Sequence, residues 1–489
     1  MSLLLNTISK HDANVIALRD ATSTLTWGEL VLRLNSIVEW WNKEDNIMNS
    51  KNIYIFLEND VDSILCLLSA LIMGKNVALI DPNISAAKWE EIFSETDFQL
   101  ILGSAQVIQC LGLEDYALTV QQIVTNRETA VQSFNRYFND EGSVFFLTSG
   151  STGKHKLVQR KVSSLLSEGK SYGETLNLTE HDAYLAALPL HHAFACGCAL
   201  FGSIFNGGTL VLSSLFFPRA ILKWIYEYKI TVLPLIPSLV KLMTASYTKP
   251  LKVEHLRYAL IGTGQISTSL AELFYSLYGV RLSGNYGSSE TGGIAMRLPE
   301  VHPYLNLVGQ AMSGVDIIIE DDNGLAVPYN IEGNVTVRTS SLFCGYVGEN
   351  QDVQLPAKHE RWSTGDIGHL TEDGMLYISG RKSNLLQRNG KKINPVVIEN
   401  ALLCMPNIAE AVVIGLDKKE TYDDLITAVI VPKVPVLNEA QIRGYCLQQL
   451  EAYMTPEKVV FVSQIPRTVT GKVDRVSLIE SLTCGKETI

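Results

Sequence analysis

A short stretch of hydroxyl-bearing, glycine and lysine residues follows an apolar run and has the composition of a polyphosphate-binding loop. The apolar run is Val144 to Leu147, and the stretch reads Thr148, Ser149, Gly150, Ser151, Thr152, Gly153, Lys154, His155, Lys156. Glycines let backbone N–H groups turn towards an anion, hydroxyls add donors, and lysines add positive charge. A flexible surface linker is the alternative interpretation, because Ser, Thr and Gly also suit linkers.

This stretch is not a Walker A loop. That loop requires a glycine five residues before Gly153, where this chain has Thr148. It also requires a serine or threonine after its lysine, where His155 follows Lys154. The pattern therefore disfavours a P-loop NTPase.

Other short motifs lie in order along nearly the whole chain. They are Leu25 to Leu30, Asp81-Pro82, Asn285 to Glu290, Ser363 to Asp366, Gly380-Arg381, and Pro466 to Arg475. Any one of them could arise by chance or as a turn. Together with the stretch after Leu147, their types and order resemble the adenylate-forming superfamily, which includes acyl-CoA synthetases, aryl-acid ligases, luciferases and peptide-synthetase adenylation domains.

The resemblance implies three catalytic residues: Lys156, Glu290 and Lys472. In such enzymes a carboxylate attacks the α-phosphate of ATP while pyrophosphate leaves, so positioning and charge neutralisation dominate catalysis. Lys472 would enter the site during adenylation and leave when the small domain rotates. Glu290 would bind Mg²⁺ together with Thr152, since Mg²⁺ prefers oxygen ligands. The departing phosphates would be held by Lys156 with Thr148, Ser149, Gly150, Ser151, Thr152 and Gly153.

The resemblance also assigns the other contacts of the nucleotide. Asp366 would accept hydrogen bonds from the ribose hydroxyls, Arg381 would accompany it, and Tyr286 would lie against adenine. The remaining nucleotide-binding positions are Gly262, Thr263, Gly264, Asn285, Gly287, Ser288 and Ser289. Taken alone, Asp366 would be a turn residue, Tyr286 a packed core residue and Lys472 a solvated surface charge.

A further segment, Pro189 to Phe194, resembles the lining of the family's acyl site. The acyl substrate would contact His192, Phe194, Gly262 and Gly287. His191 and His192 could instead be metal ligands, or packed or capping residues, although adjacent strand side chains point to opposite faces. The segment lacks the aspartate that pairs with a substrate ammonium. The resemblance therefore implies an aryl or aliphatic acid rather than an α-amino acid.

The elements that position these residues read as parallel sheets flanked by helices. Helical spacing followed by a β-type run occurs at 62–73 and 77–80, at 220–228 and 230–235, and at 268–278 and 280–282. Asp321 to Gly324 is typical of a hairpin turn between strands at 315–320 and 335–338. These patterns predict an α/β fold.

A basic, glycine-containing stretch from Gly380 onward indicates a domain junction. We predict a large N-terminal adenylating domain at 1–380, built of sheets flanked by helices, and a small mobile α+β lid domain at 381–489. In the lid, strands are expected at 411–415 and 427–431 and a helix at 439–453. Ser383 stands at the position of the family's hinge residue.

Composition narrows the function classes. The 489 residues include 46% hydrophobic ones and carry a formal net charge of −11, which argues against a sequence-independent grip on nucleic acid. No apolar run is long enough for membrane insertion, and no basic segment precedes Leu3 to Leu5. The eight cysteines form no CxxC sets, so we expect reduced, mostly buried thiols and a cytoplasmic location.

The predicted function is ATP-dependent activation of a carboxylic acid through an acyl-adenylate, followed by transfer to a thiol. The cofactors implied are ATP, Mg²⁺ and coenzyme A, or the phosphopantetheine of a carrier protein. An acid:CoA ligase is the leading hypothesis, and a stand-alone enzyme that loads a separate carrier protein is the alternative. A non-catalytic nucleotide-binding protein of the same fold is a third. The chain is expected to be a monomer or homodimer.

Overall fold

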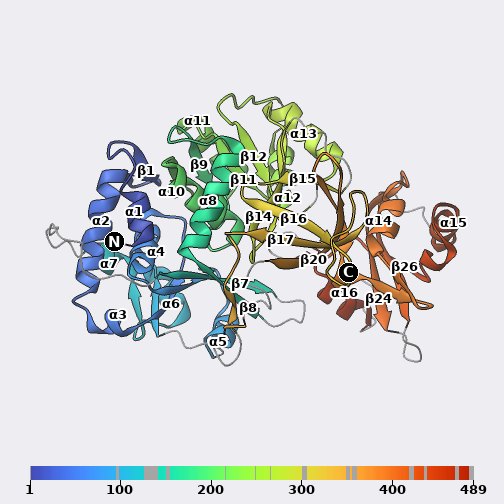
Figure 1. Ribbon diagram of the computed structural model, residues 1–489, viewed down its shortest axis with the longest axis horizontal. Helices are drawn as coiled ribbons and strands as arrows, with labels where there is room; N and C mark the ends of the chain where they lie inside the picture. The colour runs from blue at the N-terminus through green and yellow to red at the C-terminus, as the bar shows by residue number, and fades with distance from the viewer. Residues whose placement is uncertain are drawn as a thin grey trace. The chain divides into compact units, whose positions relative to one another are not determined.

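The chain divides into two compact units in the computed structural model (Figure 1). The first unit is Met1–Pro303, Gly309–Ile317 and Val337–Trp362, and the second is Tyr304–Val308, Ile318–Thr336 and Ser363–Ile489. The structure describes residues 2–94, 99–125, 141–149, 155–214, 216–247, 249–264, 266–299, 306–347, 353–354, 361–417, 423–433, 438–467 and 473–483.

Within these ranges, an eight-stranded sheet of the first unit carries the candidate phosphate-binding stretch. Its strands are β3 (Asn52–Phe56), β4 (Asn76–Ile80), β5 (Leu100–Gly103), β6 (Ala117–Thr119), β7 (Ser143–Ser149), β8 (His155–Lys161), β18 (Gly345–Val347) and β19 (Val353–Gln354). Their order is β19-β18-β8-β7-β4-β3-β5-β6. Strands β7, β4, β3, β5 and β6 run parallel, whereas β8 and β18 run antiparallel to their neighbours.

Helix α4 (Val61–Ile72) connects β3 to β4 and covers the parallel part of this sheet. Asp60 caps the helix by accepting a hydrogen bond from the N–H of Ser63. The helix is buried along almost its whole length, because it packs between the sheet and its neighbouring helices. The helix predicted at 62–73 and the strand predicted at 77–80 are therefore confirmed to within one residue.

A second sheet continues through the first unit in the order β14-β13-β12-β11-β9-β10-β1-β2. These strands are β1 (Ile16–Arg19), β2 (Thr24–Thr26), β9 (Ala183–Ala186), β10 (Thr209–Leu212), β11 (Val232–Leu235), β12 (Tyr258–Ile261), β13 (Leu282–Ser288) and β14 (Gly292–Arg297). Helices α11 (Pro218–Glu227) and α13 (Thr268–Tyr278) precede β11 and β13, as predicted. The strand expected at 280 begins two residues later, at Leu282.

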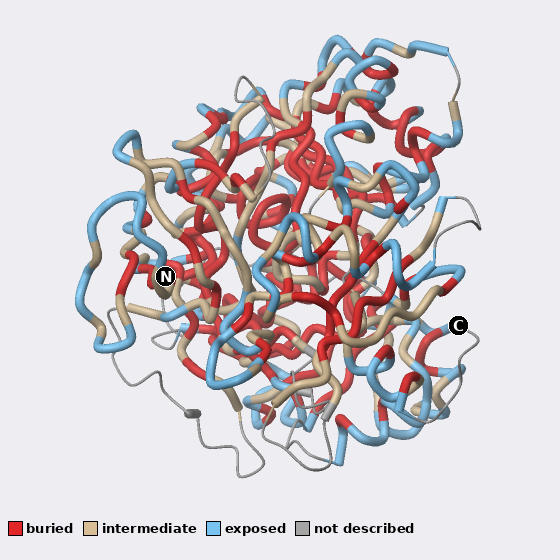
Figure 2. The backbone as a smooth tube through the Cα atoms, turned by 90° about the vertical axis from the view of Figure 1, so that its right-hand side faces the viewer, coloured by how far each residue is buried: buried red, intermediate tan, exposed pale blue. Residues whose placement is uncertain are grey.

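A helical layer built around α8 (Val162–Leu176) packs beside these strands. Helix α9 (Ala193–Ala195), a π-helix at Cys196–Phe201 and α10 (Gly202–Asn206) form one continuous helical segment against it. A Cβ at Gly169 would lie 2.3 Å from the carbonyl oxygen of Phe201, so only glycine permits this packing. In Figure 2 the buried residues form long red stretches separated by exposed turns.

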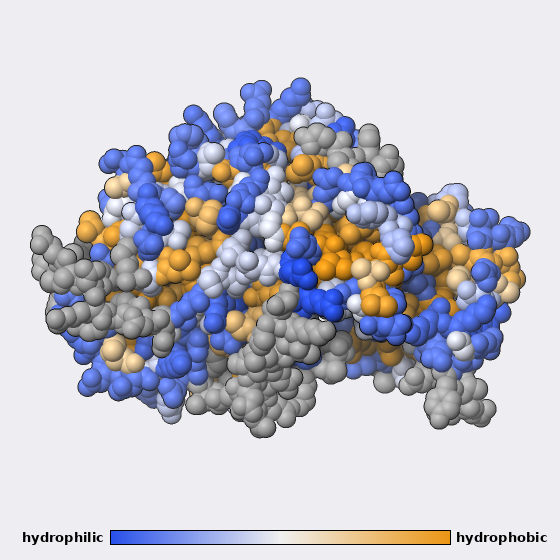
Figure 3. Space-filling view, viewed as in Figure 1, coloured by the Kyte–Doolittle hydropathy of each residue, from blue (hydrophilic) through white to orange (hydrophobic). Residues whose placement is uncertain are grey.

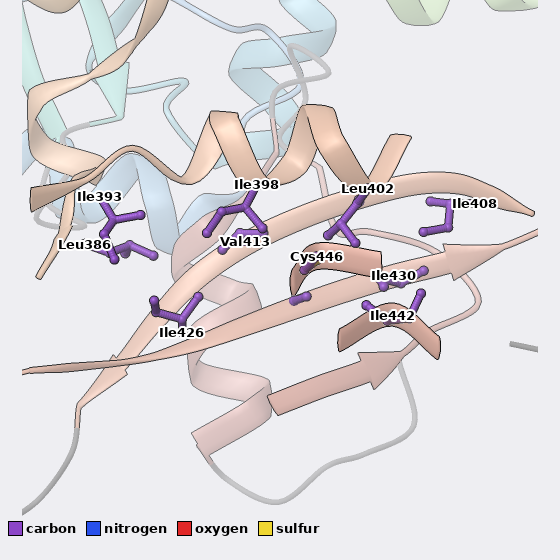
Figure 4. Packing of buried hydrophobic residues seen from close by; sticks show 12 residues of the cluster. Leu386, Ile393, Ile398, Leu402, Ile408, Val413, Ile426, Ile430, Ile442 and Cys446 are labelled. Carbon is purple, nitrogen blue, oxygen red and sulfur yellow. The ribbon is translucent and has the colours of Figure 1, made fainter. Parts of the chain in front are cut away.

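The second unit has its own hydrophobic core around a three-stranded sheet (Figure 4). The sheet consists of β24 (Ile408–Asp417), β25 (Asp424–Pro432) and β26 (Lys458–Phe461), with helices α14 (Pro395–Leu403), α15 (Glu439–Gln449) and α16 (Arg475–Thr483). The strands predicted at 411–415 and 427–431 lie inside β24 and β25. The helix predicted to reach 453 is shorter, because the backbone becomes extended at Leu450 (φ −128°, ψ 162°).

The predicted hairpin turn after residue 320 is also present. Asp321 accepts a hydrogen bond from the N–H of Asn323 through its side chain and one from the N–H of Gly324 through its carbonyl. Strands β16 (Val315–Glu320) and β17 (Gly333–Thr339) lie on either side. The Asp321 side chain therefore satisfies a backbone N–H of its own turn.

The predicted α/β fold with a small α+β unit is confirmed. Gly380 and Arg381 are the last residues of β21 (Met375–Arg381), and the domain boundary between them stays a prediction.

Within the described ranges, no helix is both long and apolar enough to cross a membrane. Hydrophobic and hydrophilic side chains are interspersed on the face shown in Figure 3. The seven cysteines described are free, and Cys66, Cys196, Cys198 and Cys446 are buried.

Candidate functional site

The two ends of the candidate phosphate-binding stretch lie on β7 and β8. The two strands pair antiparallel from Ser143 opposite Lys161 to Ser149 opposite His155. Buried Val144 and Phe146 anchor the hairpin in the sheet. The Thr148 hydroxyl donates to the carbonyl oxygen of Lys156 at 3.2 Å, which ties the two sides together. Gly150, Ser151, Thr152 and Gly153, and the side chain of Ser149, lie outside the described part of the chain.

Lys156 and Glu290 meet at a third residue, Tyr346. Glu290 lies in the turn between β13 and β14, and Tyr346 lies on β18 beside β8. The Tyr346 hydroxyl donates to Glu290 Oε1 at 2.7 Å. Lys156 Nζ lies 5.1 Å from the centroid of the Tyr346 ring. The structure thus brings together two of the three predicted catalytic residues, and sequence analysis missed the tyrosine that joins them.

The motif from Asn285 to Glu290 occupies the end of β13 and the turn after it. β13 pairs with β14, with an irregularity between Tyr286 and Gly287. A Cβ at Gly287 would lie 2.2 Å from the carbonyl oxygen of Gly292, so the close approach of β13 to β14 at this position requires glycine. Asn285 Oδ1 accepts a hydrogen bond from the buried hydroxyl of Tyr172 at 2.9 Å.

The turn itself is closed by hydroxyl groups. Ser288 accepts or donates at 3.1 Å with the hydroxyl of Thr291, which also accepts from the Ser288 N–H at 3.2 Å. Ser289 and Glu290 lie in this turn, and both are half-buried. Because these local hydrogen bonds restrain the turn, the Glu290 side chain extends from a defined backbone.

A buried ion pair contacts the backbone just after this turn. Arg160 on β8 and Glu168 on α8 form a contact of 2.8 Å between Nη1 and Oε2 with almost no solvent exposure. Glu168 Oε1 also accepts the N–H of Gly293, at 3.2 Å, just after the turn. Burial raises the pKa of Glu168, and Arg160 opposes that shift. The pair therefore links β8, the second strand of the phosphate-binding hairpin, to the start of β14.

The candidate acyl-binding segment is positioned by Asn59, which sequence analysis did not identify. The Asn59 side-chain amide donates to the carbonyl oxygens of Ala186 at 3.0 Å and Leu188 at 2.9 Å. Its oxygen accepts the N–H of Leu190 at 3.0 Å. Asn59 is buried and follows β3, so it fixes the turn after β9. No motif marks it, since a single asparagine after a strand is an ordinary loop residue.

The two histidines of this segment pack against each other. Their ring centroids are 4.3 Å apart, and Asp81 Oδ2 lies 3.9 Å from His191 Nε2. Burial is the main cause that lowers the pKa of His191 to about 4, and the neighbouring His192 adds to the shift. Asp81 opposes it. Burial also lowers the pKa of His192. His192 precedes α9 but makes no side-chain cap, and no group of three metal-ligating residues occurs among those described.

We expect His191 to make stability fall as pH falls from about 6.5 towards 4. Its pKa is lower in the folded chain than in the unfolded one, so the unfolded chain binds more protons in this window. Replacing His191 by glutamine should reduce the loss of unfolding free energy between pH 7 and pH 5 by about 2 kcal/mol. Urea titrations at both pH values measure this. The exposed His181→Gln is the control, and an unchanged pH dependence in His191→Gln would refute the assignment.

Phe194 and Gly262, both predicted to contact the acyl substrate, are close together. A Cβ at Gly262 would lie 2.8 Å from the Phe194 ring. The next residue, Thr263, has a left-handed backbone (φ 67°), a conformation that favours glycine. A Cβ at Gly264 would lie 3.3 Å from Pro237. Gly262 therefore lets the backbone approach the Phe194 ring closely, and Gly264 does the same at Pro237.

The predicted ribose-binding pair lies in the second unit. Asp366 on β20 (Trp362–Leu370) stands opposite Arg381 on β21 in the antiparallel register. Arg381 Nε donates to Asp366 Oδ1 at 2.9 Å. The N–H of Asp366 donates to the hydroxyl of Thr364 at 3.1 Å. Ser383 follows in a 3₁₀ turn at Lys382–Asn384.

Lys472, the third predicted catalytic residue, lies outside the described residues. The described residues on either side of it, Arg467 and Val473, face each other in an antiparallel bridge. Arg467 also pairs with Glu410 at 2.7 Å. The base of the segment that carries Lys472 is therefore tied to the sheet of the second unit.

In the first unit, Lys156 and Glu290 both contact Tyr346 beside the β7–β8 hairpin, and in the second unit Asp366 pairs with Arg381. Apart from Tyr346, these are residues that the motifs predicted for a nucleotide-binding enzyme. The model of the AMP-binding enzyme family matches residues 6–347, and that of the AMP-binding enzyme C-terminal domain matches residues 397–472. The chain belongs to the AMP-binding enzyme family. The predicted membership of the adenylate-forming superfamily is confirmed.

This chain is similar to known proteins in both sequence and structure. The 2-succinylbenzoate–CoA ligase of Bacillus licheniformis is 28% identical over 89% of this chain and 91% of its own length. The oxalate–CoA ligase of Arabidopsis thaliana is 25% identical over 85% of each chain. Among solved structures, ATP-bound MatB from Rhodopseudomonas palustris has a TM-score of 0.84 at 21% identity, covering 98% of each chain, and shows the shared fold.

Proposed function

We propose that this chain is an AMP-forming acid:CoA ligase, which activates a carboxylic acid with ATP through an acyl-adenylate and transfers the acyl group to coenzyme A. The observation that carries the proposal is the meeting of Lys156 and Glu290 at Tyr346, beside the hydroxyl-rich hairpin. Membership of the AMP-binding enzyme family supports it, as do relatives named as CoA ligases.

In this reaction the chain would mainly position charged groups. Lys156 and the hydroxyl and amide groups of residues 148–153 would hold the departing phosphates. The Asp366 carboxylate would accept hydrogen bonds from the ribose hydroxyls, and Arg381 would hold that carboxylate in place. Lys472 would neutralise charge at the α-phosphate as the substrate carboxylate attacks. The acyl group would then pass to a thiol, releasing AMP.

The residues present suit Mg²⁺. Glu290 offers carboxylate oxygens, the ligand type that Mg²⁺ prefers, on a turn fixed by Ser288 and Thr291. When bound, Mg²⁺ would neutralise charge on the phosphates. Thr152 stays a predicted second ligand. A metal role is not assigned to His191 and His192, because Mg²⁺ prefers oxygen ligands to imidazole nitrogen.

The substrate class we propose is an aryl or aliphatic acid. Phe194 against Gly262 offers an apolar wall. His192 precedes Phe194 by two residues, and burial lowers its pKa. Such a surface disfavours the ammonium of an α-amino acid. Relatives named for 2-succinylbenzoate and oxalate act on acids without an α-ammonium group.

Acid-dependent exchange of labelled pyrophosphate into ATP tests the proposal. A panel of aryl, short-chain and long-chain acids, with α-amino acids as controls, should yield exchange with at least one non-amino acid. Adding either CoA or a phosphopantetheinylated carrier protein then separates the two acceptors by the thioester formed. Exchange with no acid would favour the non-catalytic nucleotide-binding alternative. The cytoplasmic location and the oligomeric state stay predictions.

Replacing Asp366 by alanine should weaken ATP binding by about tenfold or more, because hydrogen bonds to a charged group are worth about 1.5–3 kcal/mol. Calorimetric titration with ATP measures the dissociation constant. Asp373→Ala, in the turn that joins β20 to β21, is the matched control and should leave it unchanged. Equal affinities for the two variants would argue against the ribose role of Asp366.

A further inference from the structure

Tyr346 lies outside the motifs found in the sequence, yet it contacts both Lys156 and Glu290. We propose that Tyr346 is a positioning residue, which orients the Glu290 carboxylate for Mg²⁺ and places the Lys156 ammonium beside it. The inference rests on the proposed function, because it concerns the binding of metal-bound ATP.

Strand pairing brings Tyr346 to Lys156. Tyr346 on β18 stands opposite Val158 on β8. Lys156 is two residues from Val158 on the same strand, so its side chain is on the same face and is a diagonal neighbour of Tyr346. The resulting distance of 5.1 Å from Nζ to the ring centroid suits a cation–π interaction. The antiparallel register, rather than a flexible surface contact, sets this pair.

Glu290 is tied to the same segment twice. Its side-chain Oε1 accepts the Tyr346 hydroxyl at 2.7 Å. Its backbone carbonyl accepts the N–H of Phe343 at 2.7 Å. Two bonds to residues three apart fix both the position of the turn and the direction of the carboxylate. A carboxylate has about four lone-pair sites, so the bond to Tyr346 and coordination of a cation are compatible.

The Tyr346 ring is itself held in place. Its centroid lies 5.0 Å from that of Phe343 and 6.2 Å from that of Trp362, both in edge-on arrangements. Phe343 is buried and also contacts Trp362 at 4.7 Å. Because this aromatic cluster restrains the ring, the hydroxyl is presented to Glu290 in one direction. Packing alone explains the ring but not the hydroxyl bond.

The Tyr346→Phe variant separates these two roles, because it keeps the ring and deletes the hydroxyl. The measurement is the dissociation constant of ATP by calorimetry, with excess Mg²⁺ and with a chelator, and the ratio of the two values. We expect the tightening of ATP binding by Mg²⁺ to shrink by about tenfold in Tyr346→Phe, while the affinity for metal-free ATP stays the same. Tyr346→Leu should in addition weaken metal-free ATP binding by about two- to fivefold, since Lys156 loses its aromatic partner.

Tyr226→Phe is the matched control. The hydroxyl of Tyr226 donates to the carbonyl oxygen of Lys252 on the surface, at 3.0 Å. This bond involves none of the predicted site residues. Its Mg²⁺ ratio should equal that of the unaltered chain. Thermal melting of every variant reports folding separately. An unchanged ratio in Tyr346→Phe, or equal losses with and without Mg²⁺, would overturn the inference. Absence of acid-dependent pyrophosphate exchange in the unaltered chain would instead overturn the proposed function.

Discussion

Replacing Lys472 by alanine is expected to slow acyl-adenylate formation by about a hundredfold or more, while transfer from a supplied acyl-adenylate to CoA continues at close to its original rate. Removing one donor aimed at developing charge has effects of about that size. The second step needs no such donor, because the α-phosphate leaves as part of AMP. Single-turnover assays of each half-reaction, with purified acyl-adenylate for the second, measure the separation.

Lys433→Ala is the control for this experiment. Lys433 is also a lysine of the second unit, and its Nζ donates to the carbonyl oxygen of Pro406 at 3.0 Å on the surface. Both half-reactions should be unaffected by its loss. If Lys472→Ala reduced the two half-reactions equally, the lysine would have a structural role, and the assignment from the motif Pro466 to Arg475 would be wrong.

The Arg160→Met variant should lose about 3–5 kcal/mol of unfolding free energy, because it leaves Glu168 buried without its partner. The loss should grow as pH rises. Burial raises the pKa of Glu168 in the folded chain, so the protonated, neutral carboxyl is compatible with folding at low pH and its ionisation opposes folding at higher pH. Urea titrations at pH 5 and pH 8 measure both effects.

Two further variants make this prediction specific. Arg160→Met combined with Glu168→Gln should recover most of the loss, because it removes both charges and keeps an acceptor for the N–H of Gly293. Lys170→Met removes an exposed ion pair with Glu174 on the same helix and should change stability by less than about 0.5 kcal/mol. Similar losses for Arg160→Met and Lys170→Met would contradict the importance of burial.

Local patterns were sufficient to predict the elements that carry the site. The apolar run before Thr148 predicts a buried strand, and glycine with hydroxyl residues predicts a turn able to bind phosphate. Alternation of helical and strand periodicity predicts the parallel sheets, since each pattern follows from which face is buried. The position of α15's end could not be predicted, because the extended backbone at Leu450 depends on the packing of the second unit.

The residues that connect the motifs could not be predicted from the sequence. Tyr346 lies 56 residues from Glu290, and Asn59 lies 131 residues from Leu190, whose N–H it accepts. Arg160 and Glu168 are near each other in sequence, yet a lysine-rich strand followed by a helix gives no sign that this pair is buried. Such contacts arise from strand order and sheet packing, which short motifs do not encode.

The fate of a labelled oxygen atom distinguishes acyl-adenylate formation from activation of the acid as an acyl-phosphate. With an accepted acid labelled with ¹⁸O in both carboxylate oxygens, together with ATP, Mg²⁺ and CoA, we expect one ¹⁸O in each AMP formed and none in pyrophosphate. That result follows if the carboxylate oxygen bonds to the α-phosphorus and stays with AMP when the thiol attacks the carbonyl carbon. Label in orthophosphate with release of ADP, detected by mass spectrometry, would contradict adenylation.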